Sequence, residues 1–340
     1  MEDLEIEMKL ERDMLFSVSG RVTDANTGFQ ITDADVRIIA TKGKTYQTNN
    51  KGEYFTKVNE DREYAVIIKK EGYVPQIFDF STEGKTEPED FVFNAALEPG
   101  HYLLVEGETL LRDGGKVEPG VNVRAVDANK RAEHKATRSR KDGRFWMVLN
   151  PADENFLVGT KEGFFASRVD LPEPGKIVGD TTIAVKLHMV RYEIGAIVKI
   201  IYYDYNQSNI KKIASKDLFE IVYFLQDNPE VSVELGSHTD SRGGDQYNMS
   251  LSQRRSDAAV AYILSRGIET KRVTAQGFGE SQLVNKCRND APCTEEEHAG
   301  NRRTEIRVTK LDMSKANEAW KKNGYYGKDA PVIGMGKFGK

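Results

Sequence analysis

Chemistry in this sequence could come from its histidines, from its cysteines, or from a dense group of polar and charged residues between Asp204 and Arg303. None of the five histidines is followed by the His-x-x-Glu spacing of a zinc peptidase. The run GMGKFG at 334–339 fits a dinucleotide fingerprint by chance, because no strand precedes it and no helix can follow it. A P-loop and a G-x-S-x-G elbow are also missing. We therefore expect neither catalysis nor a bound metal or cofactor.

The two cysteines, Cys287 and Cys293, lie close together in the polar stretch KCRNDAPCTEEE. An exposed pair that closes a short loop fits an oxidising compartment such as the periplasm better than the cytosol. Two unrelated surface thiols are the alternative. Together with His298 the cysteines supply too few ligands for zinc. The pair is therefore a candidate disulfide.

The bulk composition describes an ordinary globular protein of 340 residues, 39% hydrophobic and 30% charged, long enough for two or three domains. Its net charge of −4 argues against nucleic acid as a partner. Its longest apolar runs, such as 194–203, are too short or too interrupted to cross a bilayer, so we expect no transmembrane segment. The acidic start, Met1 to Asp13, has no signal-peptide character. The protein is therefore either cytoplasmic or, as we favour, part of a longer exported chain.

An internal repeat occupies the first two thirds of the chain, where 49–73 aligns with 139–164. Gly52 matches Gly143 at an offset of 91, and upstream Gly20 matches Gly107 at an offset of 87. Apolar residues alternate within each copy and turn signals separate the runs, as in antiparallel sandwiches. The order of these features resembles the carboxypeptidase regulatory-like domain, a small transthyretin-like β-sandwich. The resemblance is close in the first copy and looser in the second.

The apolar period changes near Ile194, after which strand and helix patterns follow one another. Their order, β-α-β-α-β-β, predicts a mixed sheet with helices on one side. The predicted fold class is multidomain, with two all-β transthyretin/Ig-like sandwiches followed by an α+β unit. The expected divisions are an extension at 1–14, sandwiches at 15–98 and 99–190, the α+β domain at 191–310 and a loosely held tail at 311–340.

The α+β segment carries the runs GSHTDSRGGDQYN, LSQRRSDAAVAYILSRGI, RVTAQGFGES and NRRTEIRV in this order. Over about 195–309 these runs resemble the OmpA-like domain, which is also found in the peptidoglycan-associated lipoprotein and in the flagellar stator protein MotB. One departure is Gly236-Ser-His-Thr-Asp, where most members have Gly-His-Thr-Asp. We therefore expect a bulge at the end of this strand.

The resemblance implies binding of the peptide stem of peptidoglycan, chiefly the free amino-acid end of meso-diaminopimelate. By the same match, Asp240 takes the ammonium and Arg255 the carboxylate. Such a zwitterion needs one anion and one forked cation, and charge-assisted bonds are about twice as strong as neutral ones. We expect Asp240 to follow a strand and Arg255 to lie in the first turns of a helix, so that neither carries the core. The residues expected to line or border the site are Asn248, Asp204, Asn206 and Arg303.

Each residue also has an ordinary alternative. Asp240 could cap the turn that follows it, and Arg255 could form a surface salt bridge, the role that we give to Arg254. His238 is expected to be a packed or hydrogen-bonded loop residue rather than a ligand group. Arg302 is expected to be a solvated strand residue.

The sequence thus predicts a non-enzymatic peptidoglycan-binding protein that anchors an outer-membrane or periplasmic assembly to the cell wall. The sandwiches are expected to contact other envelope proteins. This domain combination resembles envelope lipoproteins associated with type IX secretion. Two rivals are a peptidoglycan hydrolase, which needs a carboxylate pair or a metal site, and a structural adaptor whose OmpA-like fold binds proteins instead.

Overall fold

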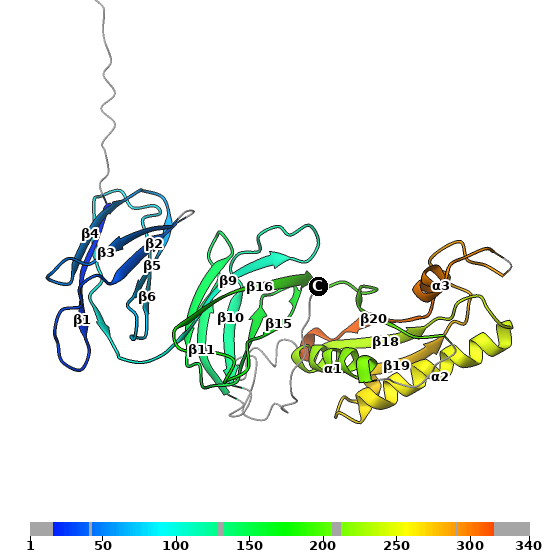
Figure 1. The fold of residues 1–340 in the computed structure, drawn as a ribbon. Helices are drawn as coiled ribbons and strands as arrows, with labels where there is room; N and C mark the ends of the chain where they lie inside the picture. Colours follow the sequence, from blue (N-terminus) through cyan, green and yellow to red (C-terminus); the bar gives the residue numbers. More distant parts are fainter. Residues whose placement is uncertain (1–15, 41–42, 128–131, 206–211, 290, 316–340) are drawn as a thin grey trace, which may run out of the picture.

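The computed structural model describes residues 16–40, 43–127, 132–205, 212–289 and 291–315, which form three consecutive units (Figure 1). The predicted extension at 1–14 and most of the predicted tail lie outside these residues. Within the described ranges, no helix has the length and apolar character required to span a membrane. The prediction of a β-rich N-terminal region followed by an α+β unit is confirmed.

The first unit consists of two sheets that enclose an apolar core. One sheet has the order β4-β1-β7, with β8 also paired to β1, and the other has the order β3-β2-β5-β6. Alternate residues of β5, such as Val66 and Ile68, enter the core between the sheets. The strands are β1 (Phe16–Asp24), β2 (Asp35–Ile39), β3 (Gly43–Gln47), β4 (Glu53–Val58), β5 (Glu63–Lys69), β6 (Gln76–Ser81), β7 (Asp90–Val92) and β8 (Ala95–Leu97).

The second unit repeats this two-sheet arrangement, with strand orders β12-β9-β16-β14 and β11-β10-β13-β15. The matched glycines Gly20 and Gly107 both lie so close to a neighbouring residue that a side chain would not fit. A Cβ atom would lie 1.9 Å from the Phe93 carbonyl oxygen in the first unit and 1.9 Å from the Phe145 ring in the second. The strands are β9 (Leu103–Leu111), β10 (Asn122–Asp127), β11 (Ala132–Arg138), β12 (Arg144–Leu149), β13 (Asn155–Thr160), β14 (Phe164–Phe165), β15 (Ser167–Asp170) and β16 (Thr181–Arg191).

The third unit is a mixed sheet of order β17-β20-β18-β19, in which β18 and β19 are parallel and the other pairs antiparallel. Helices α1 and α2 lie on one side of this sheet (Figure 1), and buried residues such as Leu218, Leu235 and Ile263 form the core. Its elements are β17 (Ile197–Tyr202), α1 (Lys212–Asp227), β18 (Val231–Ser237), α2 (Asp245–Leu264), η1 (Thr270–Arg272), β19 (Val273–Gly277), α3 (Glu295–Asn301) and β20 (Arg303–Leu311).

The expected bulge at the end of β18 is wrong. Gly236 and Ser237 pair in regular register with β19 and with β20, and the irregularity of this strand lies at its start, between Ser232 and Val233. Gly236 fits because the Phe278 ring covers it, so that a Cβ atom would lie 2.8 Å from that ring. Ser237 thus continues the regular strand.

Apolar contacts also join the three units. In β5 and in β12 both faces are buried, which explains the near-continuous apolar runs YAVII and FWMVL. Ile67 of the first unit and Trp146 and Val148 of the second belong to one cluster between these units. Phe165 of the second unit belongs to the core of the third.

Candidate ligand-binding site at the edge of the C-terminal sheet

The predicted site residues that the structure describes lie near the point where two strands of the third unit end and a third begins. Strand β17 ends there and β20 begins there, with Tyr202 opposite Arg303. Strand β18 ends beside them. The chain then continues into α2 through residues 238–244, which we call the HTD loop. This topology brings Asp240 and Arg255 into the same electrostatic neighbourhood.

Asp240 is 3% exposed, and arginines surround its carboxylate. Its Oδ2 atom accepts hydrogen bonds from Arg242 Nη2 at 2.6 Å and from Arg302 Nη1 at 2.9 Å. Its Oδ1 atom accepts one from the backbone N–H of Arg242 at 3.2 Å, which is the turn-capping bond that the ordinary alternative anticipates. Burial acts to raise the pKa of Asp240, but the bonds from the two arginines outweigh it and hold the pKa below its usual value. The carboxylate is therefore an anion at neutral pH.

Arg255 is only 1% exposed and lies in the middle of α2, not in its first turns. Its guanidinium donates to the backbone carbonyls of His238 at 3.2 Å and Asp204 at 3.4 Å, and lies 4.7 Å from the centre of the Tyr203 ring. Burial lowers its pKa, which nearby Tyr203 and Asp240 partly restore. The expectation that Arg255 carries none of the core is wrong, because it is among the largest fully buried side chains described. A surface salt-bridge role is excluded by the same burial.

Asn248, which the sequence also predicted to line the site, holds the HTD loop in place. It is 1% exposed, and its Nδ2 atom donates to the carbonyls of Asp240 and Arg242 at 3.3 Å each and to the Glu280 carboxylate. His238 is packed as expected, 1% exposed and stacked on Phe278 with ring centres 5.1 Å apart. These contacts hold the HTD loop, and with it Asp240, against α2 and Phe278.

The two neighbouring arginines of the NRR motif differ from expectation. Arg302 is 5% exposed, so its assignment as a solvated residue is wrong, and it connects Asp240 to the carbonyl of Tyr203 at 3.1 Å. Arg303 instead donates to Glu305 at 2.8 Å and to the carbonyl of Gln282 at 3.3 Å. Its position at the border of the site stays a prediction.

The Asp204 to Asn206 turn is described only in part. Asp204 is exposed, and its carbonyl receives the bond from Arg255, whereas Asn206 lies outside the described residues. The sequence interpretation missed two aromatic neighbours, Tyr205 and Tyr247, which are 55% and 49% exposed. The guanidinium of Arg242 lies 4.3 Å from the Tyr205 ring centre, a cation–π contact. Arg242 and Tyr205 are 37 positions apart in the sequence, so residue spacing gives no signal for this contact.

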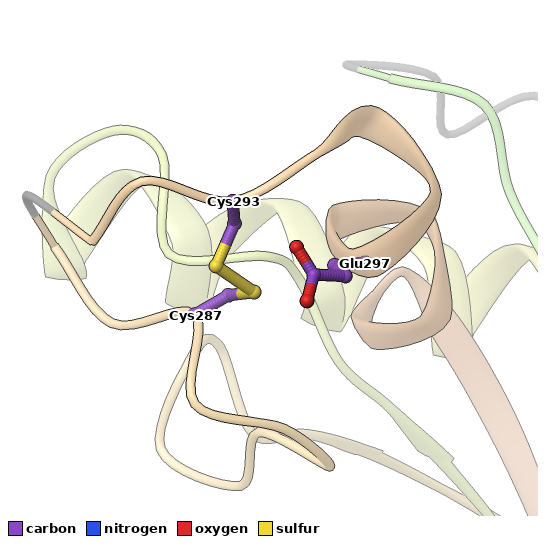
Figure 2. Close-up of side chains that lie close together, drawn as sticks. All are labelled: Cys287, Cys293 and Glu297. Carbon is purple, nitrogen blue, oxygen red and sulfur yellow. A yellow bond between two sulfur atoms is a disulfide. The ribbon is translucent and has the colours of Figure 1, made fainter.

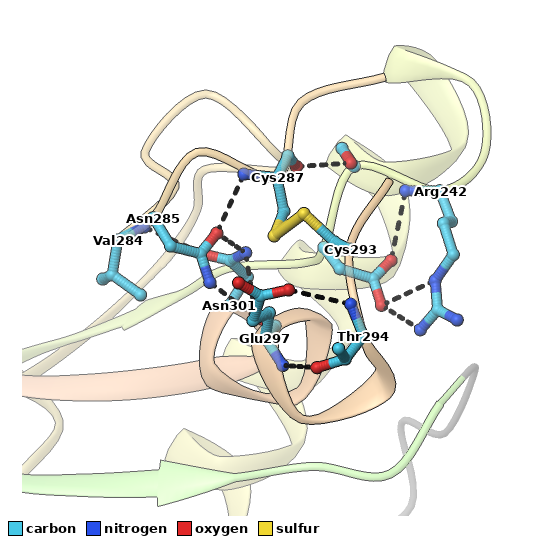
Figure 3. Close-up of a disulfide and its surroundings, with 10 residues drawn as sticks. Arg242, Val284, Asn285, Cys287, Cys293, Thr294, Glu297 and Asn301 are labelled. Atoms are coloured by element: carbon cyan, nitrogen blue, oxygen red, sulfur yellow. Dashed lines mark hydrogen bonds and ion pairs between the residues drawn. A yellow bond between two sulfur atoms is a disulfide. The ribbon is translucent and has the colours of Figure 1, made fainter. Parts of the chain in front are cut away.

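A disulfide joins Cys287 to Cys293 beside the HTD loop (Figure 2). Glu297 lies close to both sulfur atoms, and these three residues are the only group within the described ranges whose ligand atoms are close enough together to hold a metal. A disulfide supplies no thiolate, so this group does not fit a metal site. The Glu297 carboxylate instead accepts a hydrogen bond from the Thr294 backbone at 2.8 Å, as one half of a capping box at the start of α3 (Figure 3).

The disulfide loop connects to Asp240 in two ways. Ser241, next to Asp240, donates its hydroxyl to the Cys287 carbonyl at 2.6 Å. Glu295, in the first turn of α3, pairs with Arg242 at 2.8 Å and with Arg302 at 2.8 Å. The arginines on Asp240 thus have a second carboxylate partner, supplied by a helix that the disulfide precedes directly.

Comparison with known proteins gives this unit its class. Residues 202–295 match the OmpA family, so the third unit is an OmpA-like domain. Outer membrane porin F of Pseudomonas fluorescens is 37% identical over 106 residues, which cover 31% of this chain and 31% of the porin. The peptidoglycan-associated lipoprotein of Buchnera aphidicola subsp. Baizongia pistaciae is 32% identical over 84 residues, or 25% of this chain and 49% of the lipoprotein. The matches therefore span about half or less of these curated relatives.

Among solved structures, the peptidoglycan-associated lipoprotein from Burkholderia pseudomallei is similar at 22% identity and a TM-score of 0.30. The match covers 33% of this chain and 90% of that one.

Proposed function

We propose that the OmpA-like domain binds peptidoglycan without catalysis, through the zwitterionic end of diaminopimelate in the stem peptide. The observation that carries this proposal is the pair of deeply buried, oppositely charged groups, Asp240 and Arg255, at one sheet edge. Burying a charge is costly, and a core of the same volume would be apolar if stability alone were selected. The relative named a peptidoglycan-associated lipoprotein supports peptidoglycan, the coarser part of this proposal.

In this proposal Asp240 binds the ligand ammonium and Arg255 the carboxylate. Arg242, whose side chain is 34% exposed, exchanges places with the ammonium and keeps Glu295 as its partner, while the buried Arg302 stays on Asp240. The carboxylate reaches Arg255 by displacing its bond to the Asp204 carbonyl, which is long at 3.4 Å. The exposed rings of Tyr205 and Tyr247 offer apolar contact to the rest of the stem.

The cellular role follows from this binding. We propose that the protein resides in the periplasm with an outer-membrane association and links an envelope assembly, such as a type IX secretion system, to the wall. The two sandwiches, which we place in the transthyretin-like class of regulatory domains, act as spacers and docking modules in this arrangement. Their boundaries are proposed at 15–98 and 99–190, with the OmpA-like domain at 191–310.

A structural adaptor that binds proteins through a degenerate OmpA-like fold is the second candidate. The contact that favours it is the full pairing of Asp240 with Arg242 and Arg302, which leaves the anion already neutralised. In such an adaptor the same residues would serve only to hold the loop.

Sedimentation with purified peptidoglycan distinguishes the two candidates. The intact chain should co-sediment, and Asp240→Asn and Arg255→Lys should each lose most of this binding. Lysine keeps the charge of Arg255 but lacks the planar fork that holds a carboxylate with two parallel bonds. Arg254→Lys is the matched control, because Arg254 is exposed one position away. Circular dichroism must show each variant folded, and equal co-sedimentation of folded variants and control would support the adaptor instead.

A further inference from the structure

The outer face of the β4-β1-β7 sheet in the first sandwich carries apolar side chains that nothing described covers. Phe55 of β4 is 64% exposed and Val92 of β7 is 59% exposed. Both lie opposite Ser19 of β1 in the sheet register, so two bulky side chains flank a small one. We call Ser19, Phe55 and Val92 the Phe55 face. An open cavity of about 620 Å³ adjoins it and is also lined by the ion pair of Arg21 and Glu53.

The internal repeat shows what occupies the same face in the second sandwich. At the offset of 91 the counterpart of Phe55 is Trp146, which is 7% exposed. Trp146 packs in one cluster with Ile39, Ala65 and Ile67, all on the outer face of the other sheet of the first sandwich. At the offset of 87 the counterpart of Ser19 is Glu106, which pairs with Arg37 of that sheet at 2.7 Å. An aliphatic sheet face therefore covers this position in the second sandwich.

The next junction continues this pattern. The counterparts of Ala65 and Ile67 at the offset of 91 are Phe156 and Val158, which are buried on the outer face of the second sandwich. Arg168 lies between Phe156 and Tyr223 of α1, 3.5 and 4.5 Å from the two ring centres, and so joins this face to the OmpA-like domain. Each sandwich thus presents an apolar outer sheet face to the unit that follows it. Among the outer sheet faces of the two sandwiches, the Phe55 face is the one that no other described unit covers.

We propose that the Phe55 face docks the aliphatic outer face of a β-sheet in another envelope protein, in the way that the second sandwich docks on the first. A second copy of this chain is not a suitable occupant, because the corresponding apolar outer faces of both its sandwiches are already covered. The counterparts of Leu104 and Val148, which are buried in the internal junction, are Ser17 and Lys57. The sheet surface around the Phe55 face is therefore more polar than the internal junction, as expected of a separable partner.

This inference rests on the proposed docking role of the sandwiches and is independent of the peptidoglycan site. Its test places a photoreactive phenylalanine analogue at position 55 of the intact chain, in the cells that produce it. Phe29 is the matched control, because it is also a phenylalanine, 73% exposed, on the turn after β1 and outside the cavity lining. We expect one crosslinked product from position 55 and none from position 29, with the crosslink in a strand of alternating aliphatic residues.

The partner so identified is then purified and titrated with the intact chain. Phe55→Ala should weaken this binding by about tenfold or more, as for a central aromatic anchor, while Phe29→Ala leaves it unchanged. The proposal is overturned by equal crosslinking from both positions, by no product from position 55, or by equal binding of the two alanine variants. A crosslink to a second copy, with a dimer in sedimentation velocity that Phe55→Ala dissolves, also overturns it. Unchanged co-sedimentation of Phe55→Ala with peptidoglycan separates this result from failure of the proposed function.

Discussion

Removing the disulfide between Cys287 and Cys293 gives the sharpest prediction for stability. The crosslink closes a loop with a sequence separation of 6, and the chain-entropy relation for a loop of this length gives about 2 kcal/mol at 25 °C. We expect a double Cys→Ala variant to lose this amount in its free energy of unfolding. The hydrogen bond from Ser241 goes to the backbone carbonyl of Cys287 and does not depend on the sulfur atoms. The loss should therefore come mainly from the freed loop.

Urea unfolding followed by circular dichroism at the helical band measures this loss, because α1, α2 and α3 all lie in the OmpA-like domain. The melting temperature should fall by an amount on the order of 10 °C. Reductant added to the parent should produce the same shift, and the double variant should not respond to reductant. If the variant were as stable as the oxidised parent, or if it also responded to reductant, the assignment of this stability to the crosslink would be refuted.

Three further outcomes follow from other contacts. Arg168→Met should lower the free energy of unfolding by about 3 kcal/mol in urea titration, since it removes a buried cation that pairs with the carboxylates of Asp170 and Asp227; an unchanged midpoint would contradict this. Arg242→Ala should tighten binding of a diaminopimelate stem peptide by about threefold or more in calorimetry, because it removes a competitor from Asp240; weaker binding would contradict the exchange. Burial, aided by nearby Arg303, lowers the pKa of His238 from 6.5 to about 4, so the folded state binds fewer protons than the unfolded chain between these values. Stability should therefore fall as pH drops through this window, and His238→Gln should flatten that dependence; equal slopes would count against it.

Residue spacing predicted the order of elements better than it predicted burial. Alternation of apolar residues predicted the β-rich N-terminal region, and the change of apolar period near Ile194 predicted the strand and helix order that includes α1 and α2. Helix α3 was not predicted, although Thr294 and Glu297 already form a capping-box pattern in the sequence.

The details of the site depended on orientation, which spacing does not settle. Arg302 and Arg303 are neighbours, yet the first caps α3 and binds Asp240, while the second starts β20 and binds Glu305. If the strand register moved by one residue, Arg303 instead of Arg302 would face Asp240. The stacking of the units was missed for a different reason. Alternation of apolar residues predicts one buried face per strand, whereas the continuity of a run such as FWMVL indicates burial on both faces.

In the proposed site Asp240 and Arg255 hold the two charges of one zwitterion. Calorimetry of the intact chain should compare two stem peptides, one with meso-diaminopimelate and one with lysine at the same position. Lysine retains the ammonium for Asp240 but lacks the carboxylate for Arg255. We predict that the parent prefers the diaminopimelate peptide by about 2 kcal/mol or more, roughly thirtyfold. Arg255→Lys should lose that preference, and Arg254→Lys should keep it. Equal affinity of the folded parent for both peptides would contradict the account.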